Sequence, residues 1–106
     1  MSMYCHPEKF GLTTIGEIDW EGESYSYDLT VVWKRNSDGR LLYADDCGCS
    51  CPTPFEDIGI DDLVLLPEVG GLEAFKNHCK TQRSRNPNSA METVELLAKM
   101  YQAGLR

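Results

Sequence analysis

The residues of this chain with the greatest chemical potential are three cysteines that alternate with single residues. Cys47, Cys49 and Cys51 would project to the same side of an extended backbone, because successive side chains of a strand point to opposite faces. Thiolates grouped in this way can bind a soft ion such as zinc. A fourth ligand would have to come from elsewhere in the sequence, where the candidates are Cys5, His6, His78 and Cys79.

Two other interpretations of the cysteines compete with a metal site. Paired zinc ligands are usually separated by roughly two to four residues, so the single intervening residue is less typical of zinc. Pro52 and Pro54 stiffen the chain here, and the cysteines would then be small, partly buried residues of a rigid loop. A reversible disulfide is the third interpretation, because a ring closed across one residue is strained and easily reduced. The residues alone leave all three open.

No constellation typical of an enzyme accompanies the cysteines. His78 could activate Cys49 or Cys51 as a nucleophile, but the sequence shows no third residue to orient the histidine and no oxyanion donor. A glycine-rich phosphate loop, a GxSxG elbow and an HExxH pair are also missing from the sequence. We therefore expect no catalytic residues and no cofactor, with zinc as the alternative.

Charge is unevenly distributed along the chain. Seventeen acidic and ten basic side chains give a net charge of -7, yet residues 63–106 carry six basic and four acidic side chains. The total charge disfavours nucleic acid and anionic lipid as partners. The basic cluster near the middle of this second part is interpreted either as a solvated helix end or as a contact for phosphate or an acidic partner; it contains Lys76, Lys80, Arg83 and Arg85.

Cysteine usage indicates where the protein resides. The five cysteines are an odd number, and the first ten residues do not resemble a secretory signal. This combination predicts the reducing cytoplasm, with thiols that are free or metal-bound. The longest aliphatic run, Leu63–Leu66, is far too short to cross a membrane, so we expect no membrane partner.

Alternating residues predict the strands that position this segment. The clearest strand is Ser24–Lys34, where Tyr25, Tyr27, Leu29, Val31 and Trp33 share one face, as in a half-buried antiparallel strand. The aromatic residues of that face form either a stacking platform for nucleic acid or, as we expect, part of the core. A turn at 36–39 leads into a partner strand, Arg40–Asp45, and an earlier strand, Thr13–Trp20, carries a bulge at Gly16.

Two helices are predicted after the loop at 46–62. The first, Leu72–Arg83, places Leu72, Phe75 and Cys79 on one side. The second begins with a capping box of Ser89 and Glu92 and ends at Gly104. We expect its apolar stripe to close the open face of the sheet; the stripe contains Val94, Leu97, Ala98, Tyr101 and Leu105.

These elements together predict an α+β fold and a single domain over residues 1–106. A small antiparallel sheet, formed by the central hairpin and one N-terminal strand, would pack against the two C-terminal helices. The N-terminal residues as far as Leu12 are expected to be irregular.

The segment from Asp46 to Glu56 resembles a D-x-G-C-S-C-P-x-P-F-E signature of small uncharacterised proteins of actinobacteriophages, especially mycobacteriophages. The similarity extends over roughly residues 25–105, although only the signature is specific. The signature leaves the position of Cys47 variable, so the resemblance favours a Cys49–Cys51 pair over a three-cysteine site. It implies no activity, only a setting: a phage accessory protein in the cytoplasm of a bacterial host.

We therefore expect a non-enzymatic protein-interaction module whose partner is an unidentified host or phage protein. The predicted docking surface is the rigid segment itself, with Cys49, Cys51, Pro52, Pro54, Phe55 and Glu56. A first alternative is a small zinc-binding domain that uses Cys49, Cys51, Cys79 and His78. A second is an acidic mimic of nucleic acid, which the net charge permits.

Overall fold

The sheet is an antiparallel meander in which each strand pairs with the next one along the chain, in the order β1-β2-β3-β4. The computed structural model describes residues 2–22, 25–49 and 53–106, with Cys49 described only in its backbone. The strands are β1 (Leu12–Asp19), β2 (Ser26–Arg35), β3 (Leu41–Cys49) and β4 (Val64–Leu65). The helices are η1 (Pro7–Phe10), η2 (Ile60–Asp62), α1 (Gly71–Cys79) and α2 (Ser89–Gln102).

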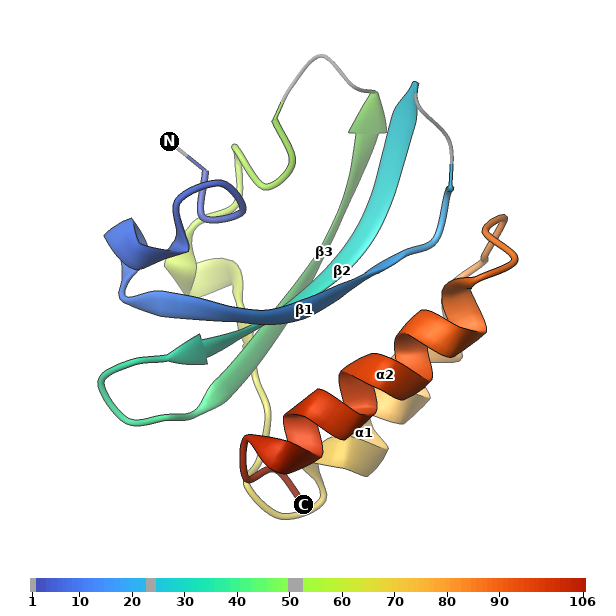
Figure 1. The fold of residues 1–106 in the computed structure, drawn as a ribbon. Coiled ribbons are helices and arrows are strands. Elements are labelled where there is room, and N and C mark those ends of the chain that lie inside the picture. Colours follow the sequence, from blue (N-terminus) through green and yellow to red (C-terminus); the bar gives the residue numbers. More distant parts are fainter. Residues whose placement is uncertain (1, 23–24, 50–52) are drawn as a thin grey trace.

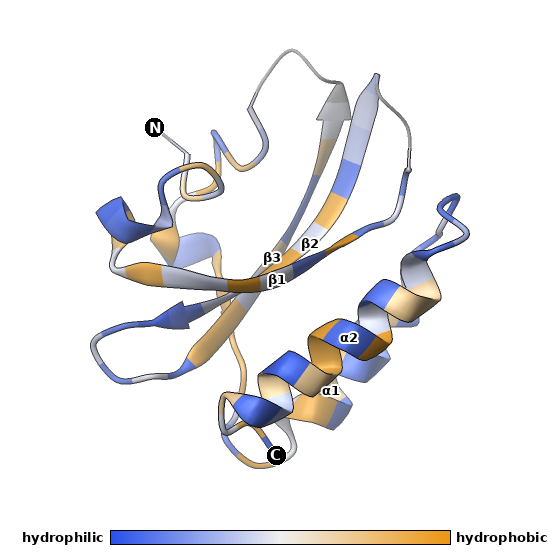
Figure 2. Ribbon diagram, in the orientation of Figure 1, coloured by the Kyte–Doolittle hydropathy of each residue, from blue (hydrophilic) through white to orange (hydrophobic). Residues whose placement is uncertain are grey.

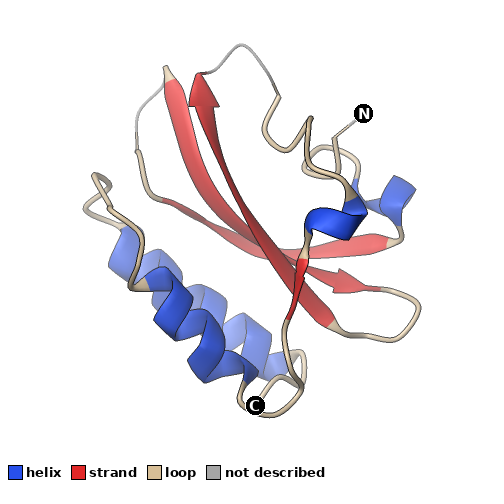
Figure 3. Cartoon of the chain, turned by 180° about the vertical axis from the view of Figure 1, so that it is seen from behind, coloured by secondary structure: helices blue, strands red, loops and turns tan. Residues whose placement is uncertain are grey.

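This architecture confirms the predicted α+β class, with the central hairpin, the N-terminal strand and the C-terminal helices as expected. The two helices lie side by side on one face of the sheet (Figures 1 and 3). The short β4, which pairs with Leu42 and Tyr43 of β3, adds an edge strand.

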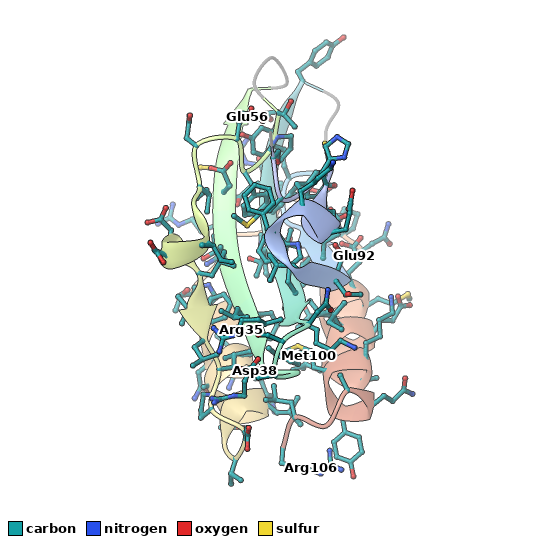
Figure 4. All side chains as sticks on the ribbon, turned by 90° about the vertical axis from the view of Figure 1, so that its left-hand side faces the viewer. Arg35, Asp38, Glu56, Glu92, Met100 and Arg106 are labelled. Atoms are coloured by element: carbon teal, nitrogen blue, oxygen red, sulfur yellow. The ribbon has the colours of Figure 1, made fainter. Side chains whose placement is uncertain are left out.

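The hairpin of β2 and β3 is the longest pairing in the sheet, running from Lys34 opposite Leu41 to Ser26 opposite Cys49. Its turn contains Gly39 with a positive φ of 74°. A 2.6 Å ion pair joins Arg35 to Asp38 across the turn (Figure 4). The guanidinium of Arg35 lowers the pKa of Asp38 to about 2.

The predicted bulge in β1 is confirmed, but the extra residue is Ile15, one position before the expected Gly16. Register shifts between Thr14, which lies opposite Trp33, and Gly16, which lies opposite Val32. A Cβ atom at Gly16 would lie 2.8 Å from Cδ1 of Leu96 on α2. The glycine therefore lets α2 approach the backbone of β1 closely.

Both faces of the central strand β2 are buried, which corrects the prediction of a half-buried strand. The face with Leu29, Val31 and Trp33 packs in one apolar cluster, and Val32 on the opposite face packs in a second. The helices cover the Val32 face, whereas the N-terminal segment and the loop around Phe55 cover the Trp33 face. Two layers therefore shield the sheet, one on each side.

The N-terminal segment belongs to the second of these layers and is not simply irregular. Met3 is fully buried in the cluster with Trp33, and Ser2 is buried as well. The four-residue helix η1 follows, and its C-cap residue Gly11 has a positive φ of 72°. Cys5 and His6, in contrast, are exposed on the outside of this segment.

The helices meet the sheet with different residues from those predicted. On α1, Phe75 and Cys79 are buried and Leu72 is partly buried, as the sequence indicated. On α2, Leu96 and Met100 are buried against the sheet, whereas Val94 is 66% and Tyr101 54% exposed. Of the expected stripe, only Leu105 is fully buried and Leu97 partly so.

The predicted capping box at the start of α2 is also wrong. Asn88 is the N-cap residue, and its side chain makes no capping hydrogen bond. The carboxylate of Glu92 instead accepts hydrogen bonds from the backbone N–H of Asp19, at 2.8 Å, and from the amide of Asn86, at 3.2 Å. This side chain thus fastens α2 to the end of β1.

Candidate functional site

The cysteine-containing segment is partly strand, because β3 continues through Cys49 where the sequence predicted a loop from residue 46. Cys47 lies opposite Asp28, which places it on the face of the sheet that turns toward the helices, and the backbone of Cys49 pairs with Ser26. The side chain of Cys47 is exposed and free. Cys51 and Pro52, two of the predicted docking residues, lie outside the described residues, as does the side chain of Cys49.

Phe55 is an internal residue, which corrects its predicted role in a docking surface. Its side chain is 0% exposed and meets the ring of Trp33 edge-on at 5.3 Å and that of Tyr4 in a stack at 5.9 Å. The carboxylate of Asp46 accepts its backbone N–H at 2.8 Å. Its φ of 65° is unusual for a residue with a side chain, so packing must hold this conformation.

The residues beside Phe55 are placed by this anchor. Pro54 is partly buried, and its carbonyl accepts a hydrogen bond from the hydroxyl of Ser2. Glu56 is exposed and lies at the end of the molecule opposite Arg106 (Figure 4). Of the predicted docking residues whose side chains are described, Glu56 alone is fully at the surface.

A chain of hydrogen bonds crosses the sheet to α1 beneath this segment. The indole N–H of Trp20 donates to Thr30 at 2.8 Å, and the hydroxyl of Thr30 donates to Asp45. The other oxygen of Asp45 lies 2.6 Å from Nε2 of His78 on α1. Both oxygens of this carboxylate are therefore engaged, and the histidine links the helix to β3.

Among the described residues, none that contacts this His–Asp pair offers an accessible nucleophile. The hydroxyl of Thr30 is fully buried and already donates to Asp45. Burial raises the pKa of the Cys79 thiol to about 12, so this thiol stays protonated near neutral pH. No hydrogen bond joins Cys47 to His78. The pair joins α1 to β3.

Of the four predicted zinc ligands, the structure describes the side chains of His78 and Cys79 only, and each of these two has other contacts. Cys79 packs in the apolar cluster with Phe75 and Met100, and Nε2 of His78 is bound to Asp45. Within residues 2–22, 25–49 and 53–106, no group of three or more histidine, cysteine, aspartate or glutamate side chains could hold a metal ion. A site that includes Cys49 and Cys51 stays a prediction.

Acidic residues gather where β1 meets α2. The hydroxyl of Tyr4 lies 3.0 Å from both carboxylate oxygens of Glu17, and burial next to this carboxylate raises the pKa of Tyr4 to about 12. Burial also raises the pKa of Glu17, assisted by the charges of Asp19 and Glu92. The exposed carboxylate of Glu17 thus lies beside Tyr4 and close to two further acidic residues.

The most distinctive surface is a groove of about 350 Å³ between α1 and α2. Lys76 of α1 and its C-cap residue Lys80 lie along one side of the groove. Ala90, Val94 and Leu97 of α2 lie along the other side, and Trp20, which follows β1, completes the lining. Beyond the groove, α2 exposes Met91 to 64% and Tyr101 to 54%. We call the exposed residues of this surface the outer helix face: Lys76, Lys80, Ala90, Met91, Val94, Ala98 and Tyr101.

The outer helix face combines apolar contact area with positive charge. Lys76 and Lys80 are exposed, and neither forms an ion pair with any residue that the structure describes. The turn that follows α1 is strongly hydrophilic (Figure 2) and includes Arg83, which is also exposed. The sequence had signalled the basic cluster, but it assigned Val94 and Tyr101 to the interior and so missed the apolar half of this surface.

Residues 1–103 match the family described as Domain of unknown function (DUF7574), and the chain belongs to this family. No curated protein matches the chain. No solved structure matches it either. Among the described residues, no helix is both long and apolar enough to cross a bilayer.

Proposed function

We propose that this domain is a non-enzymatic protein-interaction module that binds its partner through the outer helix face. The observation that carries the proposal is the second apolar stripe of α2. Leu96 and Met100 are buried in the core against the sheet, yet Met91 and Val94 expose more than half of their surface beside an open groove. Contiguous exposed apolar residues with a charged rim are typical of protein–protein contact sites.

The proposal moves the contact surface away from the cysteine-proline segment. Phe55 is required inside the molecule and cannot reach a partner without leaving the cluster of Trp33 and Met3. The exposed part of the described segment is polar, with Glu56 and Asp57 at the surface. Such a rim contributes orientation more than binding energy.

A non-catalytic role is supported by the state of the internal polar groups. His78 and Asp45 are bound to each other, and burial keeps the neighbouring thiol of Cys79 protonated. The resemblance of residues 46–56 to actinobacteriophage proteins supports a role inside an infected bacterium. We accordingly propose a phage-encoded accessory protein that acts in the host cytoplasm on a host or phage protein.

Affinity capture from cells that express the tagged protein tests the proposal. The Val94→Glu variant places a charge on the outer helix face, and we expect it to lose a partner that the wild type retains. Val69→Glu is the matched control, because Val69 is 83% exposed in the turn before α1 and does not line the groove. Partner capture that survives Val94→Glu would contradict the proposal, and loss in Glu56→Ala alone would place the contact on the cysteine-proline segment.

A further inference from the structure

The groove of the outer helix face also constrains the chemistry of what fills it. From its lining and its charge we infer that it binds an amphipathic helix of a protein partner, with acidic residues along one edge of that helix's apolar stripe. This inference rests on the proposed function and specifies the partner at the same surface.

The apolar side of the surface has the spacing of a helix-packing ridge. Met91, Val94, Ala98 and Tyr101 recur along α2 at intervals of three, four and three residues, so they lie on one side of the helix. Ala98 and the groove residue Ala90 are small, and small residues allow a second helix to approach closely. A partner helix with its own apolar stripe fits such a surface, as in other helix-in-groove contacts.

The opposite side of the groove selects the charge of the partner. Lys76 lies on α1 and Lys80 is its C-cap residue, still in helical conformation, so the two residues lie about one helical turn apart along the groove. Two carboxylates spaced by one turn on the partner helix would face them. Since the protein carries a net charge of -7, this local positive rim is a specific feature and not a consequence of composition.

A second copy of the chain matches the rim less well than an acidic helix. On α2, which would be the inserted helix, Glu92 is already bound to the backbone of β1. Glu95 is then the one other acidic residue of α2 that could approach the two lysines. The rim therefore favours a partner with more carboxylates than α2 provides.

The experiment uses two synthetic helical peptides of eighteen residues with the same leucine-alanine stripe. One carries glutamates at i and i+4 beside the stripe, and the other carries lysines there. We expect the acidic peptide to shift the amide resonances of residues 76–80 and 90–101 of the wild-type protein. Its dissociation constant should be about fivefold to tenfold lower than that of the basic peptide, which corresponds to two exposed ion pairs.

Charge reversal on the protein provides the sharpest test. In Lys76→Glu/Lys80→Glu the preference should invert in favour of the basic peptide, whereas Lys9→Glu/Lys99→Glu, which changes two exposed lysines outside the groove, should keep the wild-type preference. Raised salt should weaken the binding of the acidic peptide to the wild-type protein, because it screens the charges of the two lysines.

Several results would overturn the inference. Equal affinity for both peptides, shifts confined to other residues, or no shift at millimolar peptide would each do so. Concentration-dependent shifts of the same residues without peptide would identify a second copy as the occupant, and shifts caused by dodecanoate alone would identify an anionic lipid. If Val94→Glu loses its captured partner but neither peptide binds the wild-type protein, the proposed interaction role would stand. Only the inference that the partner contributes an acidic helix would then be wrong.

Discussion

At the scale of single residues, Phe55 shows how a distinctive surface segment can depend on one internal side chain. Its ring fills the space between Trp33 and Tyr4 in a backbone conformation with positive φ. We expect Phe55→Ala to lower the free energy of unfolding by about 3–5 kcal/mol, because the cavity cannot close between rigid neighbours. Urea titration measures this loss. In the same titration the control Asp57→Ala, at an exposed position two residues away, should change the free energy of unfolding by less than about 0.5 kcal/mol.

The thiols should differ sharply in reactivity. Cys5 and Cys47 are exposed and free, whereas burial raises the pKa of Cys79 to about 12. Since the thiolate is the reactive form, iodoacetamide at about pH 8 should label Cys5 and Cys47 in the native protein and label Cys79 only after unfolding. Peptide mass spectrometry measures each site separately. Rapid native labelling of Cys79 would show that the thiol is not held in the apolar cluster.

Glu17 predicts a pH dependence of stability. Burial raises the pKa of Glu17 in the folded state, so its contribution to stability is complete below the ordinary carboxyl value near 4.5 and is lost as the pH rises through the raised value. Glu17→Gln keeps an acceptor for Tyr4 and removes the charge. The variant should melt at a higher temperature than the wild type at pH 7, and the difference should vanish near pH 4. A lower melting temperature for the variant at pH 7 would contradict this account.

At the scale of elements, the contact of β1 with α2 depends on a glycine at the bulge. The Cβ atom in Gly16→Ala would lie 2.8 Å from the buried side chain of Leu96, so α2 must shift or Leu96 must change rotamer. We expect a loss of about 1–3 kcal/mol in the free energy of unfolding. Gly59→Ala is the control, because its Cβ atom would meet Asp62 at an ordinary 3.5 Å. Equal stability of the two variants would exclude close packing at Gly16.

Much of the element order could be predicted because local patterns were strong. The alternation of residues 24–34 and the turn at 36–39 defined the hairpin, and the interruption at Gly16 located the bulge to within one residue. The burial of both faces of β2 could not be predicted in the same way, because residues far away in sequence, Met3 and Phe55, cover the second face.

The orientation of α2 was mispredicted for a related reason. The helix has apolar residues on two sides, so a periodic pattern alone identifies two stripes and does not say which one faces the sheet. In the structure Leu96 and Met100 face the sheet. The hydrogen bond from the backbone N–H of Asp19 in β1 to the Glu92 carboxylate holds α2 in this orientation. The groove was equally hidden from the sequence, because its two walls come from different helices whose spacing is a tertiary property.

At the scale of the whole molecule, the two layers on the sheet have different roles in this account. The N-terminal segment and the Phe55 loop close one face, and the two helices close the other (Figure 1). On their outer side the helices expose a second apolar surface. Charge follows the same division, since the basic excess lies in residues 63–106 and the acidic excess in residues 1–62. An acidic protein thereby presents a positive and apolar face on its helical side.

The central claim is that α2 has an inner stripe for folding and an outer stripe for binding. Urea unfolding of Leu96→Ala and Val94→Ala tests it most directly, because the two residues lie on opposite sides of the same helix turn and differ in exposure, at 2% and 66%. We predict a loss of about 2–5 kcal/mol for Leu96→Ala and less than about 0.5 kcal/mol for Val94→Ala. A loss for Val94→Ala as large as that for Leu96→Ala would mean that the outer stripe is part of the core, and the proposed interaction surface would not exist.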